Sequence, residues 1–399
     1  MNIKDIETTV VSVPHIAPIR FSQGAALGTT RTVIKIYTDE GIIGLGETAG
    51  AAPKSTIDSN LKPILIGANP FDVEKLLAKC SGYDRYQPFY TRNMRAFSGI
   101  EIALWDIIGK SADRPVYDLL GGRYRDRVTF SGYWYPRYQN GNEGGESTPE
   151  QIASYCEKAI KQYGFKRLEG KVGVFSPDFD IQTVAAIRSR VGDEVELGVD
   201  PNGLWSPESA IKIIRKMDEY DLCNVEEPCR DLVACAGVRA RVDVPISTHC
   251  PLIAELTKLG VADVMVCDPY EVGGILSAKK LCGAAELHNL GFWIHSAAEL
   301  GVSMAANLHI AASSPHIIHP SQGTYEHVSD EIIKGGKLKI HEGSIDIPNG
   351  PGLGVELDEM KVSQYHKNFE ENGEFGFAGY GTISSDSERP DWWPSIPQW

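Results

Sequence analysis

The sequence predicts an α/β protein in which an α+β module is followed by a barrel of parallel strands. After Arg127, short β-rich runs alternate with longer helical stretches, and the runs recur at intervals of about 20 to 40 residues. This alternation is typical of βαβ units in a parallel sheet. Seven or eight such units in succession favour a closed barrel over an open sheet. No GxGxxG pattern follows the first strand of the series, as an open dinucleotide-binding sheet would require.

The first 125 residues or so form the predicted α+β module. Residues 30–48 read TRTVIKIYTDEGIIGLGET, in which two β-branched runs flank a turn at 39–41, so a hairpin is expected. Over residues 97–110, apolar side chains recur at intervals of three and four, which predicts a helix. The glycines of PVYDLLGG, at 115–122, end the element before them.

Seven runs rich in β-branched and aromatic residues predict the barrel strands. The helical stretches between them begin with signals such as Ser206-Pro207-Glu208, in which the serine can cap the helix and the proline suits its first turn. The predicted strands are VTFSGYW (128–134), RLEGKVG (167–173), VELGVD (195–200), CNVEE (223–227), VPIST (244–248), VADVMVCD (261–268) and GFWIHS (291–296).

The end of the chain has a different composition. From about Asp346 on the sequence is irregular, and it closes with SERPDWWPSIPQW. Three Trp and three Pro in so short a tail favour a segment packed against other protein, with a disordered terminus as the alternative.

The charge balance argues against nucleic acid and anionic membranes as partners. Lys and Arg number 39 and Asp and Glu 53, so the net charge is −14. Such a surface repels nucleic acid and anionic lipid, and neither is expected as a partner. A small anionic substrate would have to be drawn in by a local positive centre, such as a metal ion or a few Lys and Arg side chains.

Nothing in the sequence indicates export or membrane insertion. The stretch MNIKDIETTVVSV lacks a charged leader followed by an apolar core, and no apolar run approaches the length of a bilayer span. The eight cysteines show no CxxC pair and no zinc-type spacing, as expected for reduced thiols in a large core. We therefore expect a cytoplasmic protein.

Six predicted strands have, at or next to their carboxyl ends, a polar residue that can do chemistry. Taken singly, each has an ordinary explanation; LGVDPNGLW, at 197–205, contains the Asp, Pro, Asn and Gly that turns favour. Barrel sites lie at the carboxyl ends of the strands, so residues far apart in sequence would converge on one volume. That convergence predicts a site. The six residues are Lys171, Asp200, Glu226, His249, Asp268 and His295.

These motifs resemble the enolase superfamily, most closely its mandelate racemase and glucarate dehydratase side. They follow one another in the order Lys171, VDPNG, VEEP, Asp268-Pro269 and His295. The resemblance covers nearly all 399 residues, including GIEIALWDIIGK and PVYDLLGG early and GPGLGVEL near the end. It implies a (β/α)7β modified TIM barrel with an N-terminal α+β capping domain. We expect the capping domain over 1–125, the barrel over 126–345, and a C-terminal segment over 346–399 that packs on the capping domain.

The resemblance also implies roles for the strand-end residues. Asp200 and Glu226 would bind a divalent ion, and His249 falls at the third ligand position. Lys171 would be one acid/base, and His295 with Asp268 the other. A proton next to a carboxylate is very weakly acidic, so its removal needs a cation on the carboxylate oxygens and a positioned base.

Glu169 departs from the pattern of glucarate dehydratase-like proteins, in which the base lysine lies in Lys-x-Lys. Here the stretch reads Glu169-Gly170-Lys171, and residues two apart on a strand point to the same face. A second lysine would lower the pKa of the base, whereas a carboxylate should keep Lys171 protonated. Two hypotheses follow: Glu169 turns away and binds another group, or His295 takes the alpha proton while Lys171 acts electrostatically.

His249, in PISTHC, occupies a position usually held by Glu or Asn. Imidazole suits Mn²⁺, iron or zinc better than Mg²⁺, which prefers oxygen ligands. His249 is therefore either a ligand, which its position favours, or a neighbour or substrate contact beside an Mg²⁺ held by two carboxylates. Mg²⁺ is the expected ion, and Mn²⁺ or another divalent ion is the alternative. A neutral third ligand leaves more positive charge at the site, which favours a diacid substrate.

Several residues beside the predicted site are candidates for substrate binding. Tyr133 ends the first barrel strand, where glucarate dehydratase-like proteins have a similar tyrosine. Arg20 and Phe21 could close over the substrate, although an exposed loop arginine explains this position better. The others are Asn202, Glu169 and Ser296, and hydrogen bonding to neighbouring backbone is the alternative for Tyr133, Asn202 and Ser296.

The resemblance implies a lyase that acts on a sugar acid. It would remove the proton alpha to the carboxylate and then lose the beta hydroxyl as water, giving a 2-keto-3-deoxy acid. The alternatives are an epimerase, racemase or cycloisomerase that shares the enediolate, and a non-catalytic protein that binds acid sugars on the same scaffold. We expect a homo-oligomer.

Overall fold

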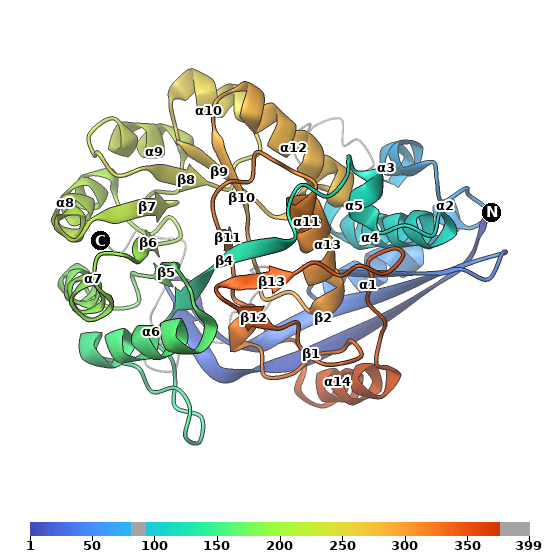
Figure 1. Cartoon of the computed structure of the whole chain (residues 1–399), viewed down its shortest axis with the longest axis horizontal. Helices are drawn as coiled ribbons and strands as arrows, with labels where there is room; N and C mark the ends of the chain where they lie inside the picture. The colour runs from blue at the N-terminus through green and yellow to red at the C-terminus, as the bar shows by residue number, and fades with distance from the viewer. Residues whose placement is uncertain (81–92, 376–399) are drawn as a thin grey trace.

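An antiparallel sheet of three strands opens the chain (Figure 1). The structure is a computed structural model that describes residues 1–80 and 93–375. Strands β1 (Ile3–Phe21), β2 (Gly24–Thr38) and β3 (Ile43–Ala49) are neighbours in this order. β2 and β3 form the predicted hairpin, whereas the long β1 is not among the elements that the sequence pattern predicts.

Helix α4 (Met94–Ser111) packs against this sheet and includes the helix predicted over 97–110. The approach is close: a Cβ built on Gly46 of β3 would lie 2.0 Å from the carbonyl oxygen of Gly99 in α4. Glycine at this crossing lets the helix backbone reach the strand. The other elements of this part are α1 (Ala52–Thr56), the π-helical η1 (Ile57–Leu61), α2 (Lys62–Leu65), α3 (Val73–Cys80) and α5 (Val116–Leu119).

Eight parallel strands form the barrel. All seven predicted strands are present, and an eighth, β11 (Ser321–Gln322), pairs with β4 on its other side. In sheet order the strands run from β10 back to β4, each parallel to the next. They are β4 (Arg127–Trp134), β5 (Arg167–Lys171), β6 (Glu196–Asp200), β7 (Leu222–Glu226), β8 (Ile246–Thr248), β9 (Val264–Cys267) and β10 (Gly291–Ile294).

Helices alternate with these strands and surround them (Figure 1). The predicted helix start at Ser206 is confirmed: its hydroxyl accepts a hydrogen bond from the N–H of Ser209, and Pro207 opens the helix. The helices are α6 (Pro149–Tyr163), α7 (Pro177–Val191), α8 (Pro207–Met217), α9 (Leu232–Arg239), α10 (Ile253–Leu259), α11 (Pro269–Val272), α12 (Ile275–Leu287) and α13 (Gly301–Ala312), with 3₁₀ turns η2 (Asp218–Tyr220) and η3 (Tyr325–His327). The architecture is a (β/α)7β barrel.

The chain then returns to the N-terminal sheet. After β12 (Ile340–His341) and β13 (Ser344–Asp346), helix α14 (Glu359–Asn372) packs against β1. The Asn368 amide donates to the carbonyl of Ser12 at 2.7 Å. The C-terminal segment thus completes the capping domain, while the boundaries 125 and 345 stay predictions. The Trp- and Pro-rich tail at 387–399 lies outside the described residues.

The cysteines and helices agree with two expectations from composition. All eight cysteines are free thiols. Within residues 1–80 and 93–375, no helix has both the length and the apolar character needed to cross a bilayer. The cytoplasmic location stays a prediction.

His309 in α13 links the barrel to the segment around Leu353. Its Nδ1 accepts a hydrogen bond from the N–H of Tyr117 at 3.2 Å, and its Nε2–H donates to the carbonyl of Leu353 at 3.1 Å. These bonds require the neutral ring. Burial lowers the pKa of His309 to about 4.

The His309→Gln variant should therefore change how stability depends on pH. The pKa of histidine in an unfolded chain is near 6.5, so below that pH protons bind the unfolded state in preference to the folded one. The free energy of unfolding of the wild type therefore falls by roughly 3 kcal/mol from this group as the pH is lowered to 4. The free energy of unfolding of the wild type minus that of the variant should shrink by this amount between pH 7 and 4, as measured by urea unfolding. His288→Gln, at an exposed position, is the control and should show a constant difference. A constant difference for His309→Gln would contradict this prediction.

Candidate active site at the strand ends

The structure brings the six predicted strand-end residues to one end of the parallel sheet. Three are the last residues of β5, β6 and β7, and three directly follow β8, β9 and β10. Hydrogen bonds and ion pairs join them in two groups, Lys171 with Asp200, and Glu226 with His249, Asp268 and His295.

Asp200 belongs both to a turn and to the site. Its Oδ1 accepts from the N–H of Asn202 at 2.7 Å, and its Oδ2 accepts from the Asn202 amide at 2.8 Å. Asn202 has φ +53, a left-handed conformation that asparagine tolerates. The ammonium of Lys171 contacts the same Oδ2. The turn that VDPNG predicts therefore holds the carboxylate that the site needs.

Lys171 is buried beside acidic groups. Burial would lower the pKa of Lys171, but the carboxylates of Asp200 and Glu226 outweigh it and raise the pKa above its ordinary value. The ammonium also lies 5.4 Å from the ring centroid of Tyr133, within the range of a cation–π contact. Lys171 is thus held in its charged form.

Glu169 does not pair with Lys171. Its Oε1 accepts from the Gln322 amide at 3.2 Å, and its Oε2 lies 3.7 Å from the Arg167 guanidinium. Burial, and then repulsion from Glu226, raise the pKa of Glu169 to about 8. This arrangement agrees with the hypothesis that Glu169 turns away and binds another group.

Gln322 is a site residue that the sequence pattern does not reveal. Its side chain is buried, and its amide donates to both Glu169 and Glu226. It lies on β11, whose two residues are too few to show the alternation by which a strand is recognised. The glycine that follows, Gly323, is the only nearby signal of an element end.

His249 lies between two carboxylates. Its Nδ1 is 2.7 Å from Oδ2 of Asp268, and its Nε2 is 2.9 Å from Oε1 of Glu226. Burial would lower the pKa of His249, but both carboxylates outweigh it and raise the pKa well above its ordinary value. Metal-binding histidines commonly donate their other ring N–H to a carboxylate. The pair with Asp268 therefore suits His249 to bind a metal through Nε2.

Asp268 holds two imidazoles at once. Its Oδ1 contacts Nδ1 of His295, and its other oxygen bonds His249. Burial would raise the pKa of Asp268, but the two imidazoles outweigh it and hold the pKa well below its ordinary value. The rings of His249 and His295 meet edge-on with centroids 4.6 Å apart. With Nδ1 engaged, Nε2 is the nitrogen of His295 that remains to exchange a proton.

The carboxylates at the strand ends fit a divalent cation. Glu169, Asp200 and Glu226 are fully buried. Burial, and then repulsion from Asp200, raise the pKa of Glu226. Buried acids so close together are stabilised by added positive charge, and carboxylate oxygens are ligands that hard cations prefer.

Three side chains that could bind a metal ion lie close together. Glu226, His249 and His295 each offer one ligand atom, and these atoms lie within 4.8 Å of one another. Asp200 lies outside this group, and its Oδ2 contacts Lys171 instead. The structure thus brings Glu226 and His249 together, while the full set of Asp200, Glu226 and His249 stays a prediction.

The ring of Tyr133 lies beside the Lys171 ammonium, and hydrogen bonds to the Tyr133 backbone hold this residue in place. Its N–H donates to Oε1 of Glu326 at 2.9 Å, and its carbonyl accepts from Nε2–H of His327 at 2.9 Å. The Tyr133 hydroxyl is buried and has no hydrogen-bond partner among the described residues. Its role in substrate binding stays a prediction.

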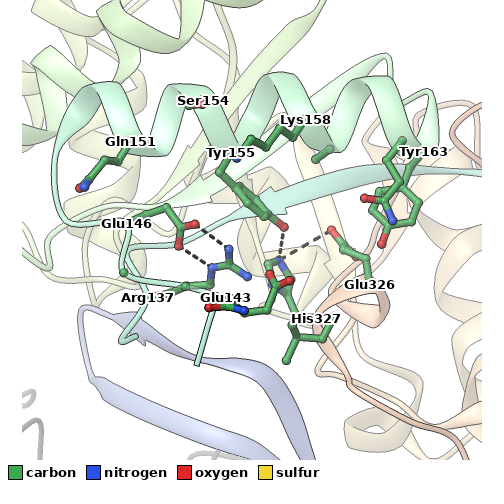
Figure 2. A pocket seen from close by; sticks show the side chains of 16 residues that line it. Arg137, Glu143, Glu146, Gln151, Ser154, Tyr155, Lys158, Tyr163, Glu326 and His327 are labelled. Atoms are coloured by element: carbon green, nitrogen blue, oxygen red, sulfur yellow. Dashed lines mark hydrogen bonds and ion pairs between the residues drawn. The ribbon is translucent and has the colours of Figure 1, made fainter. Parts of the chain in front are cut away.

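Glu326 and His327 also line a pocket of about 490 Å³ (Figure 2). The Tyr155 hydroxyl lies 3.3 Å from Nε2 of His327, and Arg137 pairs with both oxygens of Glu146 at 2.8 Å. Two residues that line this pocket, Glu326 and His327, are thus the ones that bond the backbone of Tyr133.

Two substrate-binding predictions fall on residues that the protein itself engages. The Ser296 hydroxyl donates to Glu299 at 2.6 Å. Arg20 lies in strand β1 and is only 2% exposed, so the expectation of an exposed loop arginine is wrong. Its guanidinium lies 4.6 Å from the ring centroid of Tyr138 and 5.0 Å from that of Phe175. The end of β1 thus reaches the loops that follow β4 and β5.

Two family models match the chain. The model described as the enolase C-terminal domain-like family matches residues 151–361, and that of the mandelate racemase/muconate lactonizing enzyme N-terminal domain matches residues 5–121. Together they cover the N-terminal α+β part and the barrel from β5 onward, while β4 lies in the gap between them.

Curated relatives align over most of the chain. A probable glucarate dehydratase of Streptomyces coelicolor is 26% identical, covering 99% of this chain and all of the relative. An N-succinyl-L-Arg/Lys racemase of Bacillus cereus is 28% identical over 91% of this chain and 98% of the relative. An arabinonate dehydratase of Saccharolobus solfataricus is 29% identical over 83% and 89%.

Solved structures share the fold. An enolase from Mycobacterium smegmatis, crystallised with tartrate, superposes with a TM-score of 0.91 at 28% identity, covering all of this chain and 98% of that one. An enolase from Pseudomonas fluorescens with bound magnesium, potassium and tartrate gives 0.89 at 26%, covering 100% and 99%. The chain belongs to the mandelate racemase/muconate lactonizing enzyme family of the enolase superfamily.

Proposed function

We propose that this protein is a metal-dependent dehydratase of an acid sugar. One observation carries the proposal: the His295–Asp268 pair and the Lys171 ammonium lie at the ends of β10 and β5, and the carboxylates of Asp200 and Glu226 lie on strands between them. A substrate carboxylate at those strands would have the His295 imidazole on one side and the Lys171 ammonium on the other. The names of the glucarate and arabinonate dehydratases among its relatives support the same reaction class.

The residues that would hold the cation are Asp200, Glu226 and His249. When bound, Mg²⁺ or Mn²⁺ supplies positive charge to the substrate carboxylate and so stabilises the enediolate. The magnesium in the P. fluorescens structure supports this choice of ion. The tartrate bound by two of the solved relatives supports a small dianionic substrate.

His295 and Lys171 have different roles in the proposed reaction. His295, with Nδ1 fixed by Asp268, takes the alpha proton on Nε2 and returns a proton to the departing beta hydroxyl, so that water leaves. The Lys171 ammonium, held charged by Asp200, stabilises developing negative charge. This is the electrostatic role that Glu169 suggested from the sequence, although Asp200 is the stronger cause.

The function is tested by a panel of sugar acids. Wild-type protein with Mg²⁺, and separately with Mn²⁺, is incubated with mono- and diacid sugars, and 2-keto acid is measured as its semicarbazone. We expect a keto acid from at least one member, with diacids preferred. Absence of keto acid across the panel, with binding of at least one acid shown by calorimetry, would contradict dehydration.

Epimerisation is the second candidate, supported by the racemase among the relatives. Epimerisation begins with the same removal of the alpha proton as dehydration, and the two reactions differ in their last step. In deuterated water an epimerase places deuterium on the alpha carbon and otherwise leaves the mass unchanged, whereas a dehydratase removes water.

A further inference from the structure

The loop that follows His295 is held from outside the barrel. It leads from β10 into α13, and the N-terminal sheet binds it through side chains that are far away in sequence. The Thr29 hydroxyl on β2 donates to the carbonyl of Ala298 at 2.8 Å. Arg31, also on β2, places Nη1 3.5 Å from the carbonyl of Ala297. Thr29 and Arg31 are buried, so these contacts are shielded from water.

Glu47 on β3 fixes the start of α13. Its Oε1 accepts from the N–H of Leu300 at 2.9 Å, and its Oε2 accepts from the N–H of Ser303 at 3.0 Å. The first N–H groups of a helix lack partners within the helix, so a carboxylate there is favourable. Arg31 balances the buried charge, with Nε 2.7 Å from Glu47. The sheet thus sets where the helix begins.

The backbone of the loop is strained at Ala298. This fully buried residue has φ +54, which is unfavourable for a residue with a Cβ. Its N–H donates to Oγ1 of Thr324 at 2.9 Å, and its carbonyl is held by Thr29. Such a conformation persists only where the surroundings impose it. The hydroxyl of Thr29 is therefore part of what imposes this path on the loop.

We propose that Thr29 and Glu47 are positioning residues for His295. The inference rests on the proposed function, in which His295 transfers the proton. His295 lies three residues before Ala298, so the path of the loop decides how its ring meets Asp268. Misplacing a catalytic group by about 1 Å can cost a hundredfold in rate. The N-terminal sheet thus contributes to catalysis through residues that do not lie among the strand-end groups.

The test compares matched threonines on one strand. Thr29→Val removes the hydroxyl but keeps the shape, and Thr29→Ser restores the donor. Thr32→Val is the control, because Thr32 is a buried residue of β2 that donates to the carbonyl of Gly50, 2.7 Å away, and not to the loop. Glu47→Gln is added as a second disruption. For each full-length variant, kcat and KM are measured on the sugar acid that the panel identifies, and amide hydrogen exchange is measured over residues 297–303.

Thr29→Val should lower kcat about tenfold with KM within about twofold. Thr29→Ser and Thr32→Val should stay within about twofold of the wild type. Exchange over 297–303 should be faster in Thr29→Val and Glu47→Gln than in Thr32→Val. Equal loss of kcat in Thr29→Val and Thr32→Val, or unchanged exchange in Thr29→Val, would overturn the proposal. If the wild type turns over no sugar acid, the proposed function fails, and the exchange result alone decides whether the sheet holds the loop.

Discussion

Replacing Asp268 by asparagine is expected to lower kcat by about three orders of magnitude. The two oxygens of Asp268 serve Nδ1 of His249 and Nδ1 of His295. Asparagine offers one acceptor oxygen and one NH₂ group, so it can accept from only one of the two rings. The other ring would face a donor and lose both its tautomer and its orientation.

The measurement is steady-state turnover of Asp268→Asn on the acid that the panel identifies. Glu271→Gln is the control: Glu271 lies nearby on α11 but pairs with Arg95, so its turnover should stay within about twofold of the wild type. Thermal unfolding of both variants checks that each is folded. Retention of more than about a tenth of wild-type kcat by folded Asp268→Asn would show that Asp268 does not orient a catalytic imidazole.

Glu226→Gln is expected to weaken binding of Mg²⁺ and Mn²⁺ at least about 100-fold and to lower turnover with it. Glu226 is fully buried and is the carboxylate that meets His249 on one side and Gln322 on the other. The substitution removes the negative charge of the side chain and keeps its shape, so the loss of metal affinity measures the contribution of that charge.

Removing metal with a chelator should abolish turnover of the wild type, and added Mg²⁺ or Mn²⁺ should restore it.

Binding is measured by titration calorimetry after dialysis against chelator. Glu331→Gln serves as control: Glu331 is another buried carboxyl, bonded to the hydroxyl of Tyr325, and it lies outside the strand-end groups. Its metal affinity should equal that of the wild type. Metal binding by Glu226→Gln as tight as that of the control would remove Glu226 from the ligand set.

The barrel could be predicted from the sequence because each of its strands but one is a buried run long enough to be recognised. The exception, β11, has two residues, and Gln322 was missed with it. The long β1 is also unpredicted, and this explains the error at Arg20. The Arg20 side chain is buried by contact with the loops after β4 and β5, which the sequence pattern alone does not reveal.

The convergence of the six strand-end residues could be predicted from the sequence, but Gln322 and the contacts among these side chains could not. Strand-end position alone identified the six residues, because parallel strands end side by side. That Asp268 serves two imidazoles, and that Asp200 holds Lys171 charged more strongly than Glu169 does, depends on the directions of side chains in space. Sequence spacing does not contain those directions.

The proposed reaction begins when this site removes the proton alpha to a carboxylate. The most direct measurement follows the alpha hydrogen of the bound sugar acid by proton NMR in deuterated water, for wild type, Lys171→Ala and His295→Asn. We expect loss of that signal with the wild type, slower loss with Lys171→Ala, and none with His295→Asn. A wild-type protein that binds the acid and leaves its alpha hydrogen in place would contradict the proposed reaction and indicate a non-catalytic binding protein.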